Sequence, residues 1–354
     1  MGKKQRALRG TLCSSVGGVF WGVSGACGQY LFETFGVPSI WLVCVRTLVG
    51  GGILTLLILP KYGQDLLALV RQPRELAKLA VFGLFGLLLC QYAYLTAIGY
   101  SNAGTTTVLQ TLSLVLVMLI TCAHTRTLPS RIQATALLLA LTGTFILATG
   151  GNPGQMSLSV RGLFWGLLTA VAATTYTLLP RVLVRRWGQL MVTGAGMVIG
   201  GVFINLAARS WRYSVNLPWQ GWLAVAGAVI LGSTLAFPMF MQGISDIGPV
   251  KSSMLAATEP VSATVCSALW LRTTFSPADL IGFLLILATI FLLAREDRAA
   301  GSAASDNAEE PSAGSDNAEE PSAGAGAAEK VPAGADGSGT YEALPASVGQ
   351  KRDP

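Results

Sequence analysis

MLAATEPVSATVCSALWL, residues Met254–Leu271, is a run apolar enough to lie in lipid, yet it carries a carboxylate and a proline side by side. A charged residue at the centre of a membrane helix costs about 2.5–3.5 kcal/mol on insertion scales and usually faces a cavity or a partner. Proline lacks an N–H, so Pro260 frees a backbone carbonyl one turn back in the same helix. We interpret Glu259-Pro260 as the middle of a translocation path. The alternative is a buried glutamate that only hydrogen-bonds a neighbouring helix.

The composition places this run within a membrane protein. The chain has 354 residues, of which 52% are hydrophobic and 12% charged, whereas soluble domains carry about 25% charged residues. Ten of the 18 acidic residues lie after position 298, so residues 1–298 are poor in charge. We therefore predict a polytopic protein surrounded by a lipid bilayer, followed by a polar tail. The basic excess reports charge at loop ends and does not indicate a nucleic-acid partner.

Apolar runs of about 20 residues, the length that crosses a bilayer, mark the spans. Ten occur, at roughly 11–32, 38–59, 77–99, 104–123, 132–149, 162–184, 191–208, 220–243, 253–271 and 278–294. With the N-terminus inside, the inner segments hold sixteen Lys and Arg residues and the outer segments hold four. This bias predicts an inner or plasma membrane location with both termini cytoplasmic.

The chain contains an internal repeat. Residues 94–148 align without gaps with 240–294 at an offset of 146, and Arg126-Thr127 matches Arg272-Thr273. Arg9-Gly10 and Arg161-Gly162 likewise open the first helix of each half. Each half therefore has five spans, and an odd number forces the second copy to insert upside down. Inverted repeats of this kind place a substrate site near the bilayer midplane.

These patterns divide the chain into four parts: a first five-helix repeat at 1–150, a linker at 151–160, a second repeat at 161–298 and a tail at 299–354. The tail holds the sequence SDNAEEPSAG twice in tandem and has almost no large apolar side chains. It cannot bury enough surface to offset the entropy of ordering, so we predict that it is disordered.

Polar side chains within the spans are candidates for a small-molecule site, which needs an apolar wall and a few placed polar groups. The candidates for substrate binding are Trp21, Ser24, Gln91, Tyr94, Gln110, Tyr176, Gln242 and Glu259. Taken singly, each is more typical of a helix-packing group than of a binding group. Three roles are open for Arg46: reaching an interface, pairing with Glu259, or holding an anionic substrate.

Small residues and prolines predict how the helices pack. Gly18, Gly22 and Gly25 lie along one face of the first helix and predict a close helix crossing. Pro180 and Pro238 interrupt their spans and are candidates for kinks. The six cysteines fall inside apolar segments without a C-x-x-C, which is typical of packing residues rather than of a disulfide framework or metal site.

An enzyme is the less favoured interpretation. Gly22-Val23-Ser24-Gly25 matches the G-x-S-G of rhomboid-type intramembrane proteases, which need a histidine base near the serine. The one histidine, His124, follows the fourth span on the predicted cytoplasmic side, away from Ser24. Neither H-E-x-x-H nor a Walker A motif occurs, so the sequence indicates no metal, no cofactor and no nucleotide site.

Several local patterns together resemble the EamA family of the drug/metabolite transporter superfamily. They are Trp21-Gly22, Arg46, Gly232 through Phe237, IGPVKSSMLAATEPVSA at 247–263, and the closing helices at 135–148 and 282–294. The chain departs from the family at Ser113-Leu114, where a proline-bearing motif is common. It also has Arg126-Thr127 and Arg272-Thr273 in place of a G-E-R. The resemblance implies ten helices, two inverted repeats, a central cavity and transport of small metabolites such as amino acids, often as export.

We therefore predict an all-α membrane protein with ten transmembrane helices in two inverted repeats and a disordered tail. Its predicted function is secondary active transport of a small-molecule substrate by alternating access, with protons as candidate coupling ions and no enzyme activity. The alternative is a non-transporting scaffold or assembly component that acts through its tail. A homodimer is left open.

Overall fold

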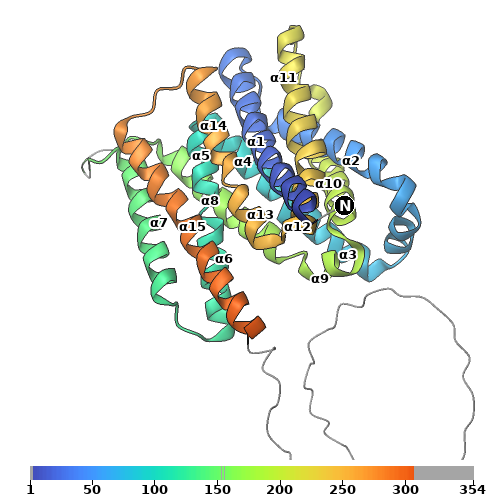
Figure 1. Cartoon of the computed structure of the whole chain (residues 1–354). Coiled ribbons are helices and arrows are strands. Elements are labelled where there is room, and N and C mark those ends of the chain that lie inside the picture. The colour runs from blue at the N-terminus through green and yellow to red at the C-terminus, as the bar shows by residue number, and fades with distance from the viewer. Residues whose placement is uncertain (1–2, 153, 155, 307–354) are drawn as a thin grey trace, which may run out of the picture. The chain divides into compact units, whose positions relative to one another are not determined.

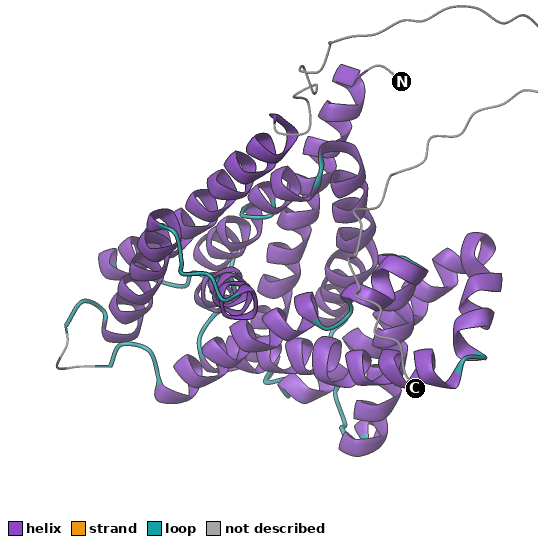
Figure 2. Cartoon of the chain, turned by 90° about the horizontal axis from the view of Figure 1, so that it is seen from below, coloured by secondary structure: helices purple, strands orange, loops and turns teal. Residues whose placement is uncertain are grey.

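The computed structural model describes residues 3–152, 154 and 156–306, and they form helices joined by loops (Figure 2). The part of the chain so described contains no β-strand. Helix α15 continues to Asp306, past the predicted start of the tail at 299. The rest of the predicted tail, residues 307–354, lies outside the described residues.

Ten helical segments, five in each half of the described chain, correspond to the ten predicted spans. The first half comprises α1 (Lys3–Phe35), α2 (Ser39–Val70), α3–η1–α4 (Pro73–Val81, Phe82–Leu88, Leu89–Tyr100), α5–α6 (Ala103–Gln110, Ser113–Thr125) and α7 (Arg131–Thr149). The second half comprises α8–α9 (Val160–Leu178, Arg181–Trp187), α10 (Gln189–Ala208), α11–η3–α12 (Trp219–Val229, Ile230–Leu235, Ala236–Ile247), α13–α14 (Pro249–Leu255, Thr258–Leu269) and α15 (Pro277–Asp306). A single 3-10 turn, η2 (Ser210–Arg212), follows α10.

Length and hydropathy separate these segments into two groups. Among the described residues, six segments are long and apolar enough to cross a membrane, and the α8–α9 pair, bent by 44° at Pro180, makes seven. The other three are α1, which is rich in glycine and serine, α13–α14, which is broken in the middle, and α15, whose apolar part is Pro277–Leu293. Small and polar residues lower the mean hydropathy of a helix, and a helix that packs against other helices can carry more of them than one that faces lipid.

The backbone confirms the internal repeat, because its irregularities recur at the predicted offset. The segments η1 and η3 are both π-helical, and positions 84–88 of η1 correspond to 230–234 in η3. The fourth and ninth segments both break, at residues 111–112 and 256–257, which is within one residue of that offset. Arg126 and Arg272 both adopt a left-handed φ of 55°. A π-helical turn is rare and often lies at a functional site.

The two breaks have different local causes. In the ninth segment Pro260 cannot donate to the carbonyl of Ala256, which instead accepts a hydrogen bond from Glu259 N at 2.9 Å. In the fourth segment the hydroxyl of Thr111 donates to the carbonyl of Val108 at 2.7 Å and competes with the helical ladder. Equivalent breaks in the two repeats thus have different residues as their cause, Thr111 in one and Pro260 in the other.

Helix α1 lies among segments of the other half, in contact with α11, η3, α12, α13 and α14 (Figure 1). Helices α7 and α15, the last of each half, pack on each other, and α10 packs on α2 and η1 (Figure 1). The predicted glycine face of α1 is confirmed for two crossings. Gly18 and Gly22 lie against α14, and Gly25 lies against the hydroxyl of Tyr94.

Candidate functional site

A cavity of about 180 Å³ lies where the two broken segments meet. The lining side chains come from both halves: Thr107, Gln110, Thr111, Ser113, Leu114, Phe240, Ala256, Ala257, Glu259, Pro260 and Ile290. Two predicted site residues, Gln110 and Glu259, are therefore brought to one cavity although 149 positions separate them. The buried Gln110 Oε1 has no hydrogen-bond partner among the described residues.

Glu259 occupies the first turn of α14, directly after the break. This corrects the prediction of one continuous helix with a free carbonyl inside it, since the segment ends at Leu255 and starts again at Thr258. Pro260 is tolerated in the first turn, where a backbone N–H has no helical partner. The N-terminal end of a helix dipole favours a negative charge. Within the described chain, no hydrogen bond or ion pair engages the Glu259 carboxylate.

Arg46 lies inside α2 and is only 4% exposed. Its guanidinium carbon stands 6.0 Å from the centre of the Tyr94 ring, and its Nε and Nη1 atoms have no hydrogen-bond partner among the described residues. The predicted alternative of an ion pair with Glu259 is wrong for this structure, because no Arg46 nitrogen lies within 4.0 Å of a described carboxylate. The two side chains project from α2 and α14 and do not form a direct ion pair.

The surroundings of Arg46 explain one glycine of η3. A Cβ atom on Gly232 would lie 2.7 Å from Arg46 Nη2 and would also collide with the hydroxyl of Ser24. Nearby, the buried hydroxyls of Ser233 and Thr234 have no hydrogen-bond partner in the part of the chain that is described. Arg46 therefore lies beside other buried polar groups of η3.

Trp21 and Ser24 attach α1 to η3 and to the end of α11, respectively. Trp21 Nε1 donates to the carbonyl of Gly232, and Ser24 Oγ donates to the carbonyl of Ala228, each at 2.9 Å. Ser24 is fully buried, and His124 is exposed in the last turn of α6. A serine engaged with a carbonyl and distant from the histidine does not form a nucleophile–base pair.

The two predicted tyrosines have separate surroundings. The Tyr94 hydroxyl lies 3.2 Å from that of Thr107, a residue of the cavity wall. Tyr176 stacks on Phe82 at 5.9 Å between ring centres and contacts Phe237 at 6.5 Å. Phe237 in turn lies 5.2 Å from Trp21, so an aromatic chain connects η1 with the first helix.

Gln91 and Gln242 are half-buried but line neither cavity that the described residues form. The prediction had not selected Ser113 and Leu114, which do line the smaller cavity. They are the positions that the 146-residue offset pairs with Glu259 and Pro260, so applying the repeat to the site would have found them.

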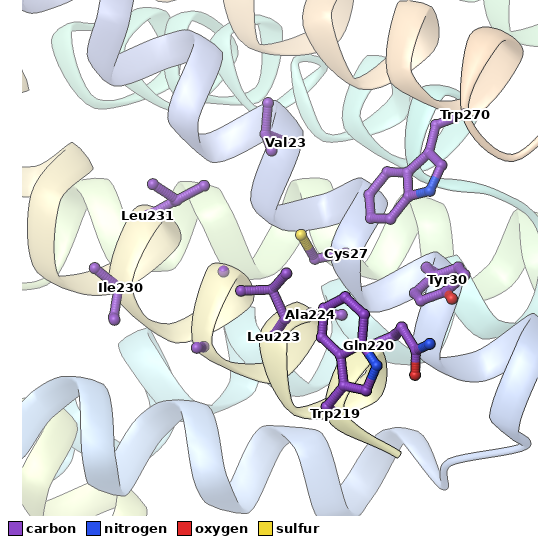
Figure 3. A pocket seen from close by; sticks show the side chains of 12 residues that line it. Val23, Cys27, Tyr30, Trp219, Gln220, Leu223, Ala224, Ile230, Leu231 and Trp270 are labelled. Carbon is purple, nitrogen blue, oxygen red and sulfur yellow. The ribbon is translucent and has the colours of Figure 1, made fainter. Parts of the chain in front are cut away.

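A larger cavity, about 580 Å³, lies between α1, α11, η3 and the residue after α14. Figure 3 shows Trp219, Tyr30 and Trp270 around it, with Val23 and Cys27 of α1 behind. Its lining holds no charged residue and none of the predicted site residues. Exposed Leu223 and Trp219 on its rim suit contact with lipid, so we place the candidate site at the smaller cavity, which Gln110 and Glu259 line.

Membrane-type helical segments in two related halves, with broken segments meeting at a cavity that both halves line, define a multi-pass membrane transporter. The chain belongs to the EamA-like transporter family, whose model matches residues 8–149 and 160–295. The family transports solutes and is not a family of enzymes.

Individual relatives agree with this assignment. The chain is 34% identical over 300 residues to the uncharacterized inner membrane transporter YicL of Salmonella typhimurium, covering 84% of this chain and 98% of that protein. It is 27% identical to the uncharacterized transporter sll0355 of Synechocystis, covering 42% of this chain and 45% of that one. A crystal structure of a protein with 20% identity covers 81% of this chain and 98% of its own, with a TM-score of 0.56, and this likeness concerns the fold alone.

Proposed function

We propose that this protein is a secondary active carrier that exports small metabolites, amino acids or related compounds, by alternating access. The observation that carries the proposal is the cavity at the paired helix breaks, with the Glu259 carboxylate and the Gln110 side chain, whose Oε1 has no partner among the described residues, in its wall. Broken helices in the middle of a transporter expose polar backbone and helix termini to a substrate. An ionisable group inside a membrane segment is by default a functional group.

Arg46 supports the choice of substrate class. A buried guanidinium without an anionic partner is costly, and a substrate carboxylate would satisfy it. Arg46 and Glu259, which do not pair with each other, thus offer one cationic and one anionic side chain, which suits a zwitterionic compound. In this proposal Glu259 binds either a proton or the substrate ammonium, so proton entry and substrate export alternate.

We also propose that the carrier lies in the inner membrane with both termini in the cytoplasm. YicL is named as an inner membrane transporter, and the positive-inside bias favours cytoplasmic termini. Arg9 and Asp246, both on predicted cytoplasmic segments, do contact each other, which supports placing those two segments on one side.

The test is transport in proteoliposomes with an imposed proton gradient, using pools of amino acids, amines and nucleobases. We expect the gradient to drive one pool, and Glu259→Gln to reduce that flux about tenfold, the factor for about 1.4 kcal/mol of lost interaction. The matched control is Asp65→Asn, which removes the same charge from an exposed site outside the cavity. Its flux should equal that of the wild type.

Two outcomes would count against the proposal. If Glu259→Gln transports with an unchanged response to the gradient, Glu259 is a packing residue and proton coupling lies elsewhere. If no pool moves although the protein is folded and inserted, the proposed substrate class is wrong.

A further inference from the structure

A bidentate ion pair joins the start of α1 to the end of α12. Arg9 Nε and Nη2 donate to Asp246 Oδ2 and Oδ1, each at 2.7 Å. The Asp246 side chain is 3% exposed and that of Arg9 is 44% exposed. Gly10 permits this approach, because a Cβ there would stand 2.6 Å from Asp246 Cβ. Paired N–H···O bonds between arginine and a carboxylate are among the stronger polar contacts in proteins.

An equivalent contact stands at the repeat-related positions. Arg161 corresponds to Arg9 at the start of the second half, and Tyr100 corresponds to Asp246 at the offset of 146. The Arg161 guanidinium carbon lies 5.9 Å from the centre of the Tyr100 ring. A Cβ on Gly162 would stand 3.0 Å from the Tyr100 carbonyl, which accepts a hydrogen bond from Ser159 Oγ at 3.3 Å.

These two contacts lie at opposite ends of the spans. Arg9 starts the first span and Asp246 ends the eighth, which the alternation of spans puts on the predicted cytoplasmic side. Tyr100 ends the third and Arg161 starts the sixth, which puts them on the other side. Each contact joins the first helix of one repeat to the third segment of the other.

We propose that Arg9–Asp246 is an inner clasp and Arg161–Tyr100 an outer clasp, and that each holds one end of the translocation path closed. The four residues are positioning residues, and the proposal rests on the alternating access proposed above. Relative movement of the repeats at one end must separate the clasp at that end. Neither clasp touches the cavity, so their role does not depend on which substrate is carried.

The clasps differ in strength. An arginine–carboxylate pair with two hydrogen bonds is stronger than the exposed cation–π contact, which contributes about 0.5–1 kcal/mol. The predicted cytoplasmic end has a further link between the halves, since Glu75 accepts a hydrogen bond from Trp187 Nε1 at 3.3 Å and lies 3.6 Å from Arg186. We infer that the resting carrier keeps its cytoplasmic end closed more firmly than its outer end.

The inner clasp is tested by thiol accessibility in membrane vesicles of known orientation. Ser14 is fully buried, about one turn beyond Arg9, and lies 3.1 Å from the hydroxyl of Ser252. In full-length protein with Ser14→Cys and the neighbouring Cys13→Ala, Asp246→Asn should raise labelling of position 14 by a sulfonated maleimide from the cytoplasmic side about fivefold, the factor for about 1 kcal/mol. The combined charge exchange Arg9→Asp and Asp246→Arg should restore low labelling. Arg131→Ala removes an exposed arginine from the same predicted side and should change nothing.

The outer clasp is tested in the same way with Thr169→Cys, a fully buried position two turns into α8. Tyr100→Leu should raise labelling from the other side, whereas Tyr100→Phe keeps the ring and should not. The expected rise is about twofold to fivefold, since a cation–π contact is worth less.

The extent of maleimide labelling is quantified by mass spectrometry of the peptide that carries the introduced cysteine. Because this measurement needs no substrate, it is independent of the transport assay. Equal labelling of the wild type and Asp246→Asn, or a rise on both sides at once, would overturn the inner clasp. A failed transport screen with sided labelling as expected would instead contradict the substrate class and leave the clasps intact.

Discussion

Gly22→Ala will strongly destabilise the folded protein, because α1 crosses α14 at this residue without room for a methyl group. A Cβ at position 22 would lie 2.5 Å from the carbonyl oxygen of Glu259 and 2.7 Å from the backbone nitrogen of Ala263, and it would collide with Ser262 Oγ. Two of these three atoms belong to the backbone, which cannot move aside as a side chain would. We expect the free energy of unfolding to fall by about 3 kcal/mol, which is the upper part of the range for overpacked cores.

The measurement is the yield of monodisperse protein by size-exclusion chromatography, together with thermal unfolding in detergent. Gly52→Ala is the matched control, since it adds the same methyl group to α2, where nothing lies within 4 Å of the new atom. It should leave the unfolding temperature unchanged or raise it, because alanine favours helix over glycine. Equal behaviour of the two variants would mean that α1 and α14 do not cross closely.

Arg46→Met will weaken binding of the transported compound about tenfold to a hundredfold, the effect of losing a charged hydrogen bond worth about 1.5–3 kcal/mol. The same substitution will raise the unfolding temperature by about 3 °C, because an apolar side chain replaces a buried charge whose Nε and Nη1 atoms have no partner among the described residues. Opposite changes in binding and stability distinguish a binding residue from a structural one.

Binding is measured as the concentration dependence of uptake in proteoliposomes, and stability by thermal unfolding of the same preparations. Arg46→Lys keeps the charge but not the planar fork, so its affinity should fall between those of the wild type and Arg46→Met. An Arg46→Met protein that unfolds at a lower temperature would assign Arg46 to the structure. The carboxylate would then have to bind elsewhere.

The course of the chain through the membrane follows from the sequence. Whether a window of about 20 residues enters lipid depends on the sum of its own transfer energies, so the spans were found without knowledge of their neighbours. The repeat was equally accessible, because equivalent positions keep residues such as Arg126 and Arg272 at a constant offset. The glycine face of α1 was predictable because residues three or four apart share one side of a helix.

The site was only partly predictable. Glu259 and Gln110 were selected as costly groups in lipid, and the structure places both in one cavity. The break before Pro260 was not predicted, since the local pattern permits either a kinked helix or two shorter ones. Gln91 and Gln242 have the same local character as Gln110 but line neither described cavity, because helix rotation decides which face a side chain occupies.

The class of fold, the ten segments and the two related halves depend on hydropathy and spacing along the chain, so they could be predicted from the residues alone. The position of Arg46 beside Tyr94 and Gly232, unpaired with Glu259, depends on how distant helices pack. So does the hydrogen bond from Ser24 to a carbonyl 204 positions away. Such contacts depend on the separation and rotation of helices that are distant in sequence, and no local preference encodes either quantity.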